Sequence, residues 1–356
     1  MTNPDRYEDV ARCPVCASDR RQRLFEGVDW LYRLPGRFPL ERCADCGLGY
    51  LSRRPTSTVL PGYYPDETYY AYRKPAPYAL FGRKDLLAAA WYLTKRSVLA
   101  YEYGYTHLGG SRLLAQLLRL PPLARLHVKA TFQLGVLLHP WVPGGALLEV
   151  GCGAGMYLDL MRSLGWTRVT GVDMAAKAVA QARSVLGLDA YTDLREAPEA
   201  AGGFDAVSLS HTLEHVAEPV ALLAAVRERM APGGRLAVVV PNMQGLGAQV
   251  FGEFWVGWDV PRHLLDFTPG SLRLALERAG FEVESLTTRP DGAYQVALFS
   301  HSRQAGDPHS VYTDAEKRFP ATRRVRALAV ALRARLACAL GRPVGEEISA
   351  VARTPA

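Results

Sequence analysis

The sequence has few cysteines and no long uncharged apolar run, and each absence excludes a class of protein. Six of 356 residues are cysteine, and four of them stand in two CxxC pairs, which indicates metal binding rather than a disulfide framework. The best apolar stretches, 86–93 and 113–138, are interrupted or bounded by Lys and Arg, so neither reads as a membrane span. The start, MTNPDRYEDV, has no basic region followed by an apolar one, so we expect a cytoplasmic protein without a signal peptide.

The remaining composition is that of a globular protein. The chain is 49% hydrophobic and 22% charged, and its length allows two or three domains with a sizeable core. The net charge of +7 and the sequence pI of about 9.1 suit anionic partners such as nucleotides, phosphoglycans, RNA or membrane surfaces. Charge alone does not choose among these partners.

Patterning divides the chain into four segments. Residues 1–75 hold the CxxC pairs and the tyrosine-rich run YYPDETYYAY, and residues 76–141 are a helical insert with Leu/Ala runs. Residues 142–302 alternate short apolar strands with amphipathic helices. Residues 303–356 form a basic tail in which RVRALAVALRARLACAL has the period of an amphipathic helix.

The third segment predicts an α/β fold with a Rossmann-like sheet. The expected strands are 146–150, 168–173, 204–210 and 235–242, and the expected helices are 154–165, 174–187, 219–230 and 269–280. This alternation is typical of a parallel sheet covered on both faces. Residues 281–289 and 293–302 flank a turn at RPDG and predict a strand pair that adds an antiparallel edge.

A glycine-rich turn follows the first strand, in the stretch LLEVGCGAGM. Gly151, Gly153 and Gly155 let the backbone bend tightly and approach a ligand. A dinucleotide fingerprint needs glycine at the sixth place of GxGxxG, where this chain has Met156. Glu149 lies just before the turn, where its carboxylate would repel a pyrophosphate and attract an ammonium group.

A second acid, Asp173, ends the second strand, where a carboxylate can accept both hydroxyls of a ribose. A ligand with an ammonium group, a ribose and no phosphate is S-adenosylmethionine. Residues 142–302 therefore resemble a class I S-adenosylmethionine-dependent methyltransferase. The resemblance implies that Glu149 binds the methionine amino group and Asp173 the ribose. It also implies that Asp193 and Leu194 flank the adenine. The neighbouring cofactor-binding candidates are Met174 and Ser210.

The stretch SHTLEHVAEP after the fourth strand carries the candidate chemistry. His215 is the expected general base, oriented by Glu214, because an imidazole titrates near neutral pH. Oxygen, carbon and nitrogen acceptors are all compatible with such a base. Two alternatives remain open: Glu214 and His215 brace the following helix, or His211, Glu214 and His215 hold a divalent metal ion.

A loop of mixed aromatic and charged residues between 241 and 272 is the expected substrate wall. The substrate-binding candidates are Tyr70, Asn242, Trp255, Trp258, Arg262 and His263. Arg262 is the candidate for a phosphate or carboxylate of the acceptor. The alternative for the tryptophans is that they pack under a long loop.

The cysteine pairs predict a structural zinc ribbon. Cys13 and Cys16 form one CxxC turn, and Cys43 and Cys46 form another. Four thiolates are the usual closed tetrahedral set for structural Zn²⁺.

The combination of CxxC…CxxCGL, YYPDETYY, LEHVAEP and DVPRHLLDFTPGSL resembles a bacterial methyltransferase group often associated with sugar, polysaccharide or natural-product pathways. Sugar C-methyltransferases share this layout, with an N-terminal tyrosine and a Glu–His pair that maps onto Glu214 and His215. The tyrosine candidates are Tyr63, Tyr64, Tyr69, Tyr70 and Tyr72. Thr212 departs from the tyrosine that those enzymes can carry. The resemblance covers roughly residues 10–75 and 142–302.

These observations predict S-adenosylmethionine-dependent methyl transfer to a small molecule or glycan, such as a sugar nucleotide, glycolipid or natural product. The alternative is an RNA methyltransferase in which the zinc ribbon and the basic tail bind the phosphates of the RNA. The sequence lacks the Asn-Pro-Pro-aromatic and Pro-Cys elements of such enzymes, so a nucleic-acid partner is disfavoured. The tail suits packing or peripheral membrane contact better than RNA binding. A third hypothesis is a non-catalytic cofactor sensor.

Overall fold

The computed structural model describes residues 6–65, 86–120, 138–306 and 319–355. Contacts within the chain separate two compact units. The first unit comprises Met1–Tyr70, His211–Glu228 and Val238–Pro355, and the second comprises Ala71–Ser210 and Arg229–Ala237. Each unit is described by itself below.

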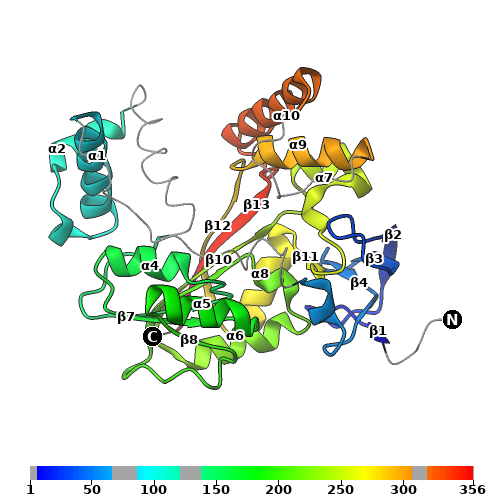
Figure 1. Ribbon diagram of the computed structural model, residues 1–356, viewed down its shortest axis with the longest axis horizontal. Helices are drawn as coiled ribbons and strands as arrows, with labels where there is room; N and C mark the ends of the chain where they lie inside the picture. The colour runs from blue at the N-terminus through cyan, green and yellow to red at the C-terminus, as the bar shows by residue number, and fades with distance from the viewer. Residues whose placement is uncertain (1–5, 66–85, 121–137, 307–318, 356) are drawn as a thin grey trace. The chain divides into compact units, whose positions relative to one another are not determined.

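The main sheet confirms the predicted α/β fold class. Within the described residues it has seven strands in the order β12-β13-β10-β9-β6-β7-β8 (Figure 1). The strands are β6 (Ala146–Val150), β7 (Arg168–Val172), β8 (Asp189–Tyr191), β9 (Phe204–Ser210), β10 (Met230–Pro241), β12 (Glu282–Arg289) and β13 (Glu347–Arg353). The pairs β6–β7, β6–β9 and β7–β8 are parallel, and β12–β13 is antiparallel. Strand β10 contributes residues to both units.

The second unit is built around the parallel strands. Every residue of β6 is buried, as expected for a strand covered on both faces. Helix α4 (Met156–Ser163) follows β6, and helix α5 (Ala176–Leu186) follows β7. Helix α5 ends at Gly187, whose φ of 61° is the left-handed cap that glycine favours. Strand β8 has only three residues, too few for a clear alternating pattern.

The described part of the predicted helical insert is helical. It contains α1 (Leu86–Glu102), the 3₁₀ turn η4 (Thr106–Leu108) and α2 (Arg112–Leu118). The Ser111 side chain caps α2 by accepting a hydrogen bond from the Leu114 amide at 3.2 Å. Leu99 and Tyr105 pack in the same hydrophobic cluster as Leu147 of β6, so the insert shares the core of the second unit.

The first unit contains the cysteine-bearing segment. Strands β2 (Arg21–Gly27), β3 (Phe38–Cys43) and β4 (Gly49–Leu51) form a sheet with β11 (Leu265–Asp266), in the order β11-β4-β3-β2. Strands β1 (Tyr7–Asp9) and β5 (Arg53–Pro55) form a separate pair, followed by the 3₁₀ helix η2 (Leu60–Tyr63). The ribbon therefore shares a sheet with a strand from the 241–272 loop.

Helices and 3₁₀ turns complete the first unit. They are η5 (Leu213–His215), α6 (Pro219–Glu228), α7 (Leu246–Phe251), η6 (Gly252–Phe254), η7 (Val256–Trp258), α8 (Pro269–Arg278), α9 (Ala293–Gln304) and α10 (Ala321–Ala339). Helix α8 begins with a capping box between Thr268 and Ser271. The amphipathic helix predicted in the tail is confirmed as α10. Among the described residues, no helix is both long and apolar enough to cross a membrane.

The predicted strand at 293–302 is wrong: these residues lie in helix α9. Ala293, Ala297 and Leu298 are its buried apolar residues, and their spacing follows the helical period rather than a strand's alternation. The antiparallel partner of β12 is β13, which comes from the tail. Its sequence, EISAVAR, is short and small-sided, so its strand signal is weak.

A second correction concerns the start of β10. The residues APGG were expected to follow a helix extending to about 230 and to precede a strand beginning at 235. Helix α6 ends at Glu228, and β10 begins at Met230, so APGG lies inside the strand. Gly203 leaves room for this part of β10, because a side chain there would come within 2.4 Å of the Ala231 backbone nitrogen.

Candidate active site

The glycine turn after β6 requires residues without side chains. Gly151, Gly153 and Gly155 have φ values of 80°, 51° and 86°, a region that favours glycine. A Cβ on Gly155 would also lie 2.5 Å from Leu188 Cδ1. The amide of Gly151 donates to the Val172 carbonyl at 2.7 Å, which holds the turn against the end of β7. The turn thus brings the ends of β6 and β7 together.

Glu149 is a buried carboxylate at the end of β6. Glu149 is 5% exposed. Its Oε2 has no hydrogen-bond partner among the described residues. Burial, together with the nearby charge of Asp173, raises the pKa of Glu149 well above its ordinary value. Because an unpartnered buried carboxylate is costly, this position is suited to a ligand that brings a positive charge or a hydrogen-bond donor.

Asp173 follows β7 and is held by two backbone amides. Its Oδ2 accepts a hydrogen bond from Gly153 N at 2.8 Å, and its Oδ1 accepts one from Ala175 N at 2.8 Å. Each carboxylate oxygen has a second lone pair, so the fixed carboxylate can also accept from two neighbouring hydroxyls. The neighbouring Met174 is 64% exposed. The second unit therefore brings Glu149, Asp173 and the glycine turn to one edge of the sheet.

The remaining predicted cofactor residues lie after β8 and at the end of β9. Asp193 accepts from the Arg195 amide at 2.8 Å, and hydrogen bonds from Arg195 lower the pKa of Asp193 to about 2. The Leu194 carbonyl accepts a hydrogen bond from Arg229. Ser210 ends β9, and its neighbour Leu209 pairs with Val150 of β6. These positions follow the carboxyl ends of parallel strands, where doubly wound sheets bind ligands.

Sequence reasoning missed a buried polar chain beside Glu149. Ser208 pairs with Glu149 across β6 and β9. The Ser208 hydroxyl donates to Tyr157 Oη at 3.0 Å and lies 2.8 Å from His139 Nε2. Burial lowers the pKa of His139 to about 3, so this imidazole is neutral. Tyr157 directly follows the glycine turn and Met156. Its place next to the turn is the feature of the sequence from which a role near Glu149 could have been predicted.

His211 is a cation held by two carboxylates. Its Nδ1 lies 3.3 Å from Glu214 Oε1, and its Nε2 lies 3.4 Å from Glu347 Oε1. Burial lowers the pKa of His211, but Glu214 and Glu347 outweigh burial and raise it to about 10. A protonated imidazole has no lone pair for a metal ion or for a proton, so in this state His211 serves neither role.

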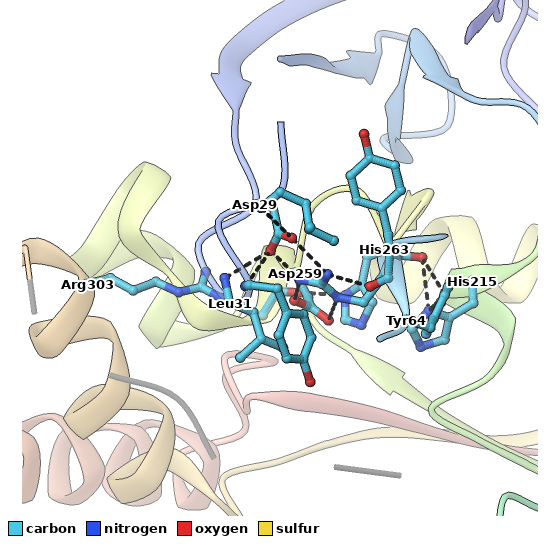
Figure 2. A network of polar contacts seen from close by, with 12 residues as sticks. Asp29, Leu31, Tyr64, His215, Asp259, His263 and Arg303 are labelled. Atoms are coloured by element: carbon cyan, nitrogen blue, oxygen red, sulfur yellow. Dashed lines mark hydrogen bonds and ion pairs between the residues drawn. The ribbon is translucent and has the colours of Figure 1, made fainter. Parts of the chain in front are cut away.

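His215 and His263, both labelled in Figure 2, each have one ring nitrogen close to a backbone carbonyl. His215 Nδ1 lies 2.9 Å from the Arg262 carbonyl and 3.1 Å from Tyr64 Oη. His263 Nδ1 lies 2.7 Å from the Gly257 carbonyl. A carbonyl only accepts hydrogen bonds, so in each neutral ring Nδ1 carries the hydrogen and Nε2 keeps a lone pair. Burial is the main cause that lowers the pKa of His263 to about 4.

Glu214 lies with these two histidines. One ligand atom each from Glu214, His215 and His263 lies within 4.8 Å of the others. Burial raises the pKa of Glu214, but the hydrogen bond and the charge of His211 are the largest opposing effects, and the pKa is lowered overall, so the carboxylate is ionised. The metal-ligand group that the structure assembles therefore contains His263 in place of the suggested His211. The carboxylate of Asp266 is also buried and has no hydrogen-bond partner among the described residues.

Arg262 is fully buried and is bound inside the protein. Its Nη2 lies 2.8 Å from Asp29 Oδ1 and 2.7 Å from Asp259 Oδ1, the two carboxylates labelled in Figure 2, and its Nη1 donates to the Tyr63 carbonyl at 3.0 Å. Two carboxylates thus surround the guanidinium that the sequence suggested for an acceptor phosphate. This ion pair ties the cysteine-bearing segment to the 241–272 loop.

The other suggested substrate residues that the structure describes are also buried. Asn242 donates to the Gly345 carbonyl at 2.8 Å. Trp255 and Trp258 stack edge to face at 4.9 Å and are buried, which is the arrangement expected of packing under a loop. Tyr69, Tyr70 and Tyr72 lie outside the described residues. Among the described tyrosine candidates, Tyr64 contacts His215 at 3.1 Å.

The four cysteines of the two CxxC pairs converge as predicted. The sulfur atoms of Cys13 and Cys46 lie 3.5 Å apart, and those of Cys16 and Cys43 lie 3.4 Å apart. All four sulfurs lie within 4.8 Å of one another. Four sulfurs bound to one tetrahedral Zn²⁺ are about 3.8 Å apart, so this cluster has the size of such a site.

Comparison with known proteins agrees with this geometry. Residues 128–286 match the family model described as a methyltransferase domain. The ubiquinone biosynthesis O-methyltransferase of Xanthomonas axonopodis pv. citri (strain 306) is 34% identical over 159 residues, which cover 41% of this chain and 66% of that protein. The enzyme of the same name from Xanthomonas campestris pv. campestris (strain B100) is 31% identical over 159 residues, again 41% of this chain and 66% of that protein. The chain thus spans slightly less than two thirds of these curated relatives.

Solved structures share less sequence with the chain. An S-adenosylmethionine dependent methyltransferase from Mesorhizobium loti has a TM-score of 0.38 and 20% identity, and covers 59% of this chain and 91% of its own. The family match includes the glycine turn and the two acids described above. Residues 128–286 of the chain are therefore similar to a methyltransferase domain.

Proposed function

We propose that the protein transfers a methyl group from S-adenosylmethionine to a hydroxyl group of a small molecule or glycan. The observation that carries this proposal is the pair of acids at the ends of β6 and β7. Glu149 is buried with an unpartnered oxygen, and Asp173 is fixed by two amides. The curated relatives are named O-methyltransferases of a small-molecule pathway, which supports an oxygen acceptor.

The two acids fit the two ends of the cofactor. Glu149 binds the methionine ammonium, which supplies the charge that this buried carboxylate requires. Asp173 accepts the ribose hydroxyls, and the glycine turn leaves room for the cofactor against the backbone. The sulfonium supplies an activated methyl group, so the protein's main tasks are alignment of the acceptor and removal of its proton.

His215 is the proposed base. Its Nδ1 hydrogen is held by the Arg262 carbonyl at 2.9 Å, which fixes the ring and leaves the lone pair of Nε2 available. Glu214 is ionised and buried, so it stabilises the imidazolium that forms when His215 takes a proton. His211 keeps its own proton between Glu214 and Glu347.

A divalent cation is the second candidate for activating the acceptor. The convergence of Glu214, His215 and His263 within 4.8 Å favours it, because two imidazoles and a carboxylate suit several first-row metals. A cation there would lower the pKa of a bound hydroxyl. Activity that persists after chelation at constant zinc content supports the base, and activity lost on chelation and restored by added metal supports the cation.

The structural zinc is proposed separately. The sulfur cluster of Cys13, Cys16, Cys43 and Cys46 would hold one Zn²⁺ and stabilise a segment with little core of its own. The zinc would take no part in the methyl transfer, because four thiolates leave no open coordination position.

The experiment that tests the function is a transfer assay with a labelled methyl group. Purified full-length protein is incubated with labelled S-adenosylmethionine and, in separate reactions, with small-molecule extracts, glycan extracts or total RNA, and the labelled product is located by mass spectrometry. We expect a methyl ether on a small molecule or glycan. Label found only in RNA would support the alternative acceptor, and binding of the cofactor without transfer to any fraction would contradict catalysis.

A further inference from the structure

Helix α10 of the basic tail packs with its small side chains inward. Its buried residues are Ala327, Val330, Ala331 and Ala334, and the helix lies against α9 (Figure 1). Amphipathic helices of globular proteins normally turn their large apolar residues toward the core. In α10 the core-facing side is mostly alanine, so the larger apolar residues must lie elsewhere on the helix.

The large apolar side chains of α10 and its cap point to solvent. They are Val325, Leu328, Leu332, Leu336 and Leu340, with exposed fractions between 50% and 71%. At about 100° per residue, these positions form one stripe about 120° wide. The centre of the stripe lies roughly opposite the buried alanines on the same helical projection. Exposed leucines in one continuous row are unusual on a protein surface and mark an interaction site.

Arginines flank this stripe on both sides. Arg324 and Arg335 project beside one edge, and Arg326 and Arg333 project beside the other, about 80–100° from the stripe's centre. The sequence has no Asp or Glu between Lys317 and Gly345. The surface of α10 thus combines a continuous apolar row with positive charge only.

A hollow between α9 and α10 extends the same chemistry. It has a volume of about 490 Å³, and its polar lining comes from Tyr294, Arg324 and Arg335. Its apolar lining includes Leu328 and Leu332 of the stripe. Two guanidinium groups and a phenol therefore border an apolar floor, an arrangement suited to a phosphate above hydrocarbon.

We propose that α10 binds the surface of an anionic lipid bilayer, with the leucine stripe among the acyl chains and the arginines on the lipid phosphates. An apolar face flanked by arginines is the pattern of interfacial helices. A second copy of the chain would place arginines against arginines. A nucleic acid would bind the arginines but would leave the leucines exposed to water.

The test is co-sedimentation of full-length, zinc-containing protein with lipid vesicles, without methyl donor or acceptor. This measurement is independent of the proposed function. Vesicles contain phosphatidylcholine alone or mixed with phosphatidylglycerol. We expect binding to the anionic vesicles at low salt and at least tenfold weaker binding to the neutral ones, because each arginine near the surface contributes about 1 kcal/mol.

Two variants of the stripe and a matched control separate the contributions. Leu328→Gln with Leu332→Gln and, separately, Arg326→Glu with Arg333→Glu should each weaken anionic-vesicle binding by at least about tenfold. The control is Leu113→Gln, which changes a leucine of α2 that is 65% exposed and should bind like the unmodified protein. Circular dichroism checks that each variant is folded.

Three results would overturn the proposal. The first is equal sedimentation with neutral and anionic vesicles. The second is unchanged binding by both stripe variants. The third is a dimer in analytical ultracentrifugation that the leucine variants dissociate, with no vesicle binding, which would assign the stripe to a second copy.

Discussion

Replacing Glu149 with Gln should stabilise the protein without cofactor and weaken its binding of S-adenosylmethionine. The carboxylate is 5% exposed, and its Oε2 has no hydrogen-bond partner among the described residues. Leaving such a group unsatisfied costs about 1–3 kcal/mol. The amide of glutamine has the same shape and is still polar, but it has no charge to desolvate, so we expect the free energy of unfolding to rise by up to roughly that amount.

The same substitution removes the partner of the cofactor's ammonium group. A hydrogen bond to a charged group is worth about 1.5–3 kcal/mol, so affinity should fall about 10–150-fold. Urea denaturation gives the stability without cofactor, and isothermal titration calorimetry gives the affinity. The stabilisation that saturating cofactor confers should shrink in the variant accordingly.

The pH dependence supplies an independent check. Burial raises the pKa of Glu149 in the folded protein, so the folded state binds more protons than the unfolded state just above the ordinary carboxyl pKa. The contribution of Glu149 to stability is therefore fully present below about pH 4.3 and is lost as pH rises through the raised pKa. Glu149→Gln should remove this loss of stability at higher pH. The loss is measured as the difference between the curves of unfolding free energy against pH for the unmodified protein and the variant. A variant that is less stable than the unmodified protein and binds the cofactor equally well would refute the reasoning.

Four further predictions concern separate parts of the molecule. Asp173→Ala should weaken cofactor binding about 100-fold, measured by calorimetry, whereas Asp189→Ala, at the exposed first residue of β8, should leave it unchanged; equal losses would contradict the ribose assignment. His215→Ala should bind the cofactor normally but show no turnover in the labelled-methyl assay, and normal turnover would remove His215 from the role of base. Arg262→Ala should lower the free energy of unfolding by about 3–5 kcal/mol, because two buried carboxylates lose their partner; denaturation of an equally stable variant would contradict this. Metal analysis should find about one zinc per chain, reduced in Cys43→Ser, and its absence from the unmodified protein would leave the sulfur cluster without its proposed ion.

Much of the second unit could be predicted because its signals are local. The strand ALLEV, the glycine turn and Asp173 all lie within about 30 residues of one another in the sequence, which is the length of a βαβ unit. The predicted β9 matches the observed Phe204–Ser210. Parallel pairing then brings the ends of β6 and β7 together without any further information, so the candidate cofactor residues follow from the order of the elements.

The features that the sequence did not predict depend on contacts between residues that are distant in the chain. Arg262 pairs with Asp29, 233 positions earlier in the chain, and no local pattern distinguishes such a pair from a free arginine. His263 joins His215 because a segment of the 241–272 loop is fixed by the pairing of β11 with β4. Strand β13 was missed for a related reason: its partner β12 lies on the other side of two helices in the sequence.

The most direct test of the central claim is a crystal structure of the protein with bound S-adenosylmethionine. We predict that the methionine ammonium contacts the Glu149 carboxylate and that both ribose hydroxyls contact Asp173, with the glycine turn against the cofactor. Cofactor bound away from these two acids, or a dinucleotide bound in its place with higher affinity, would contradict the account.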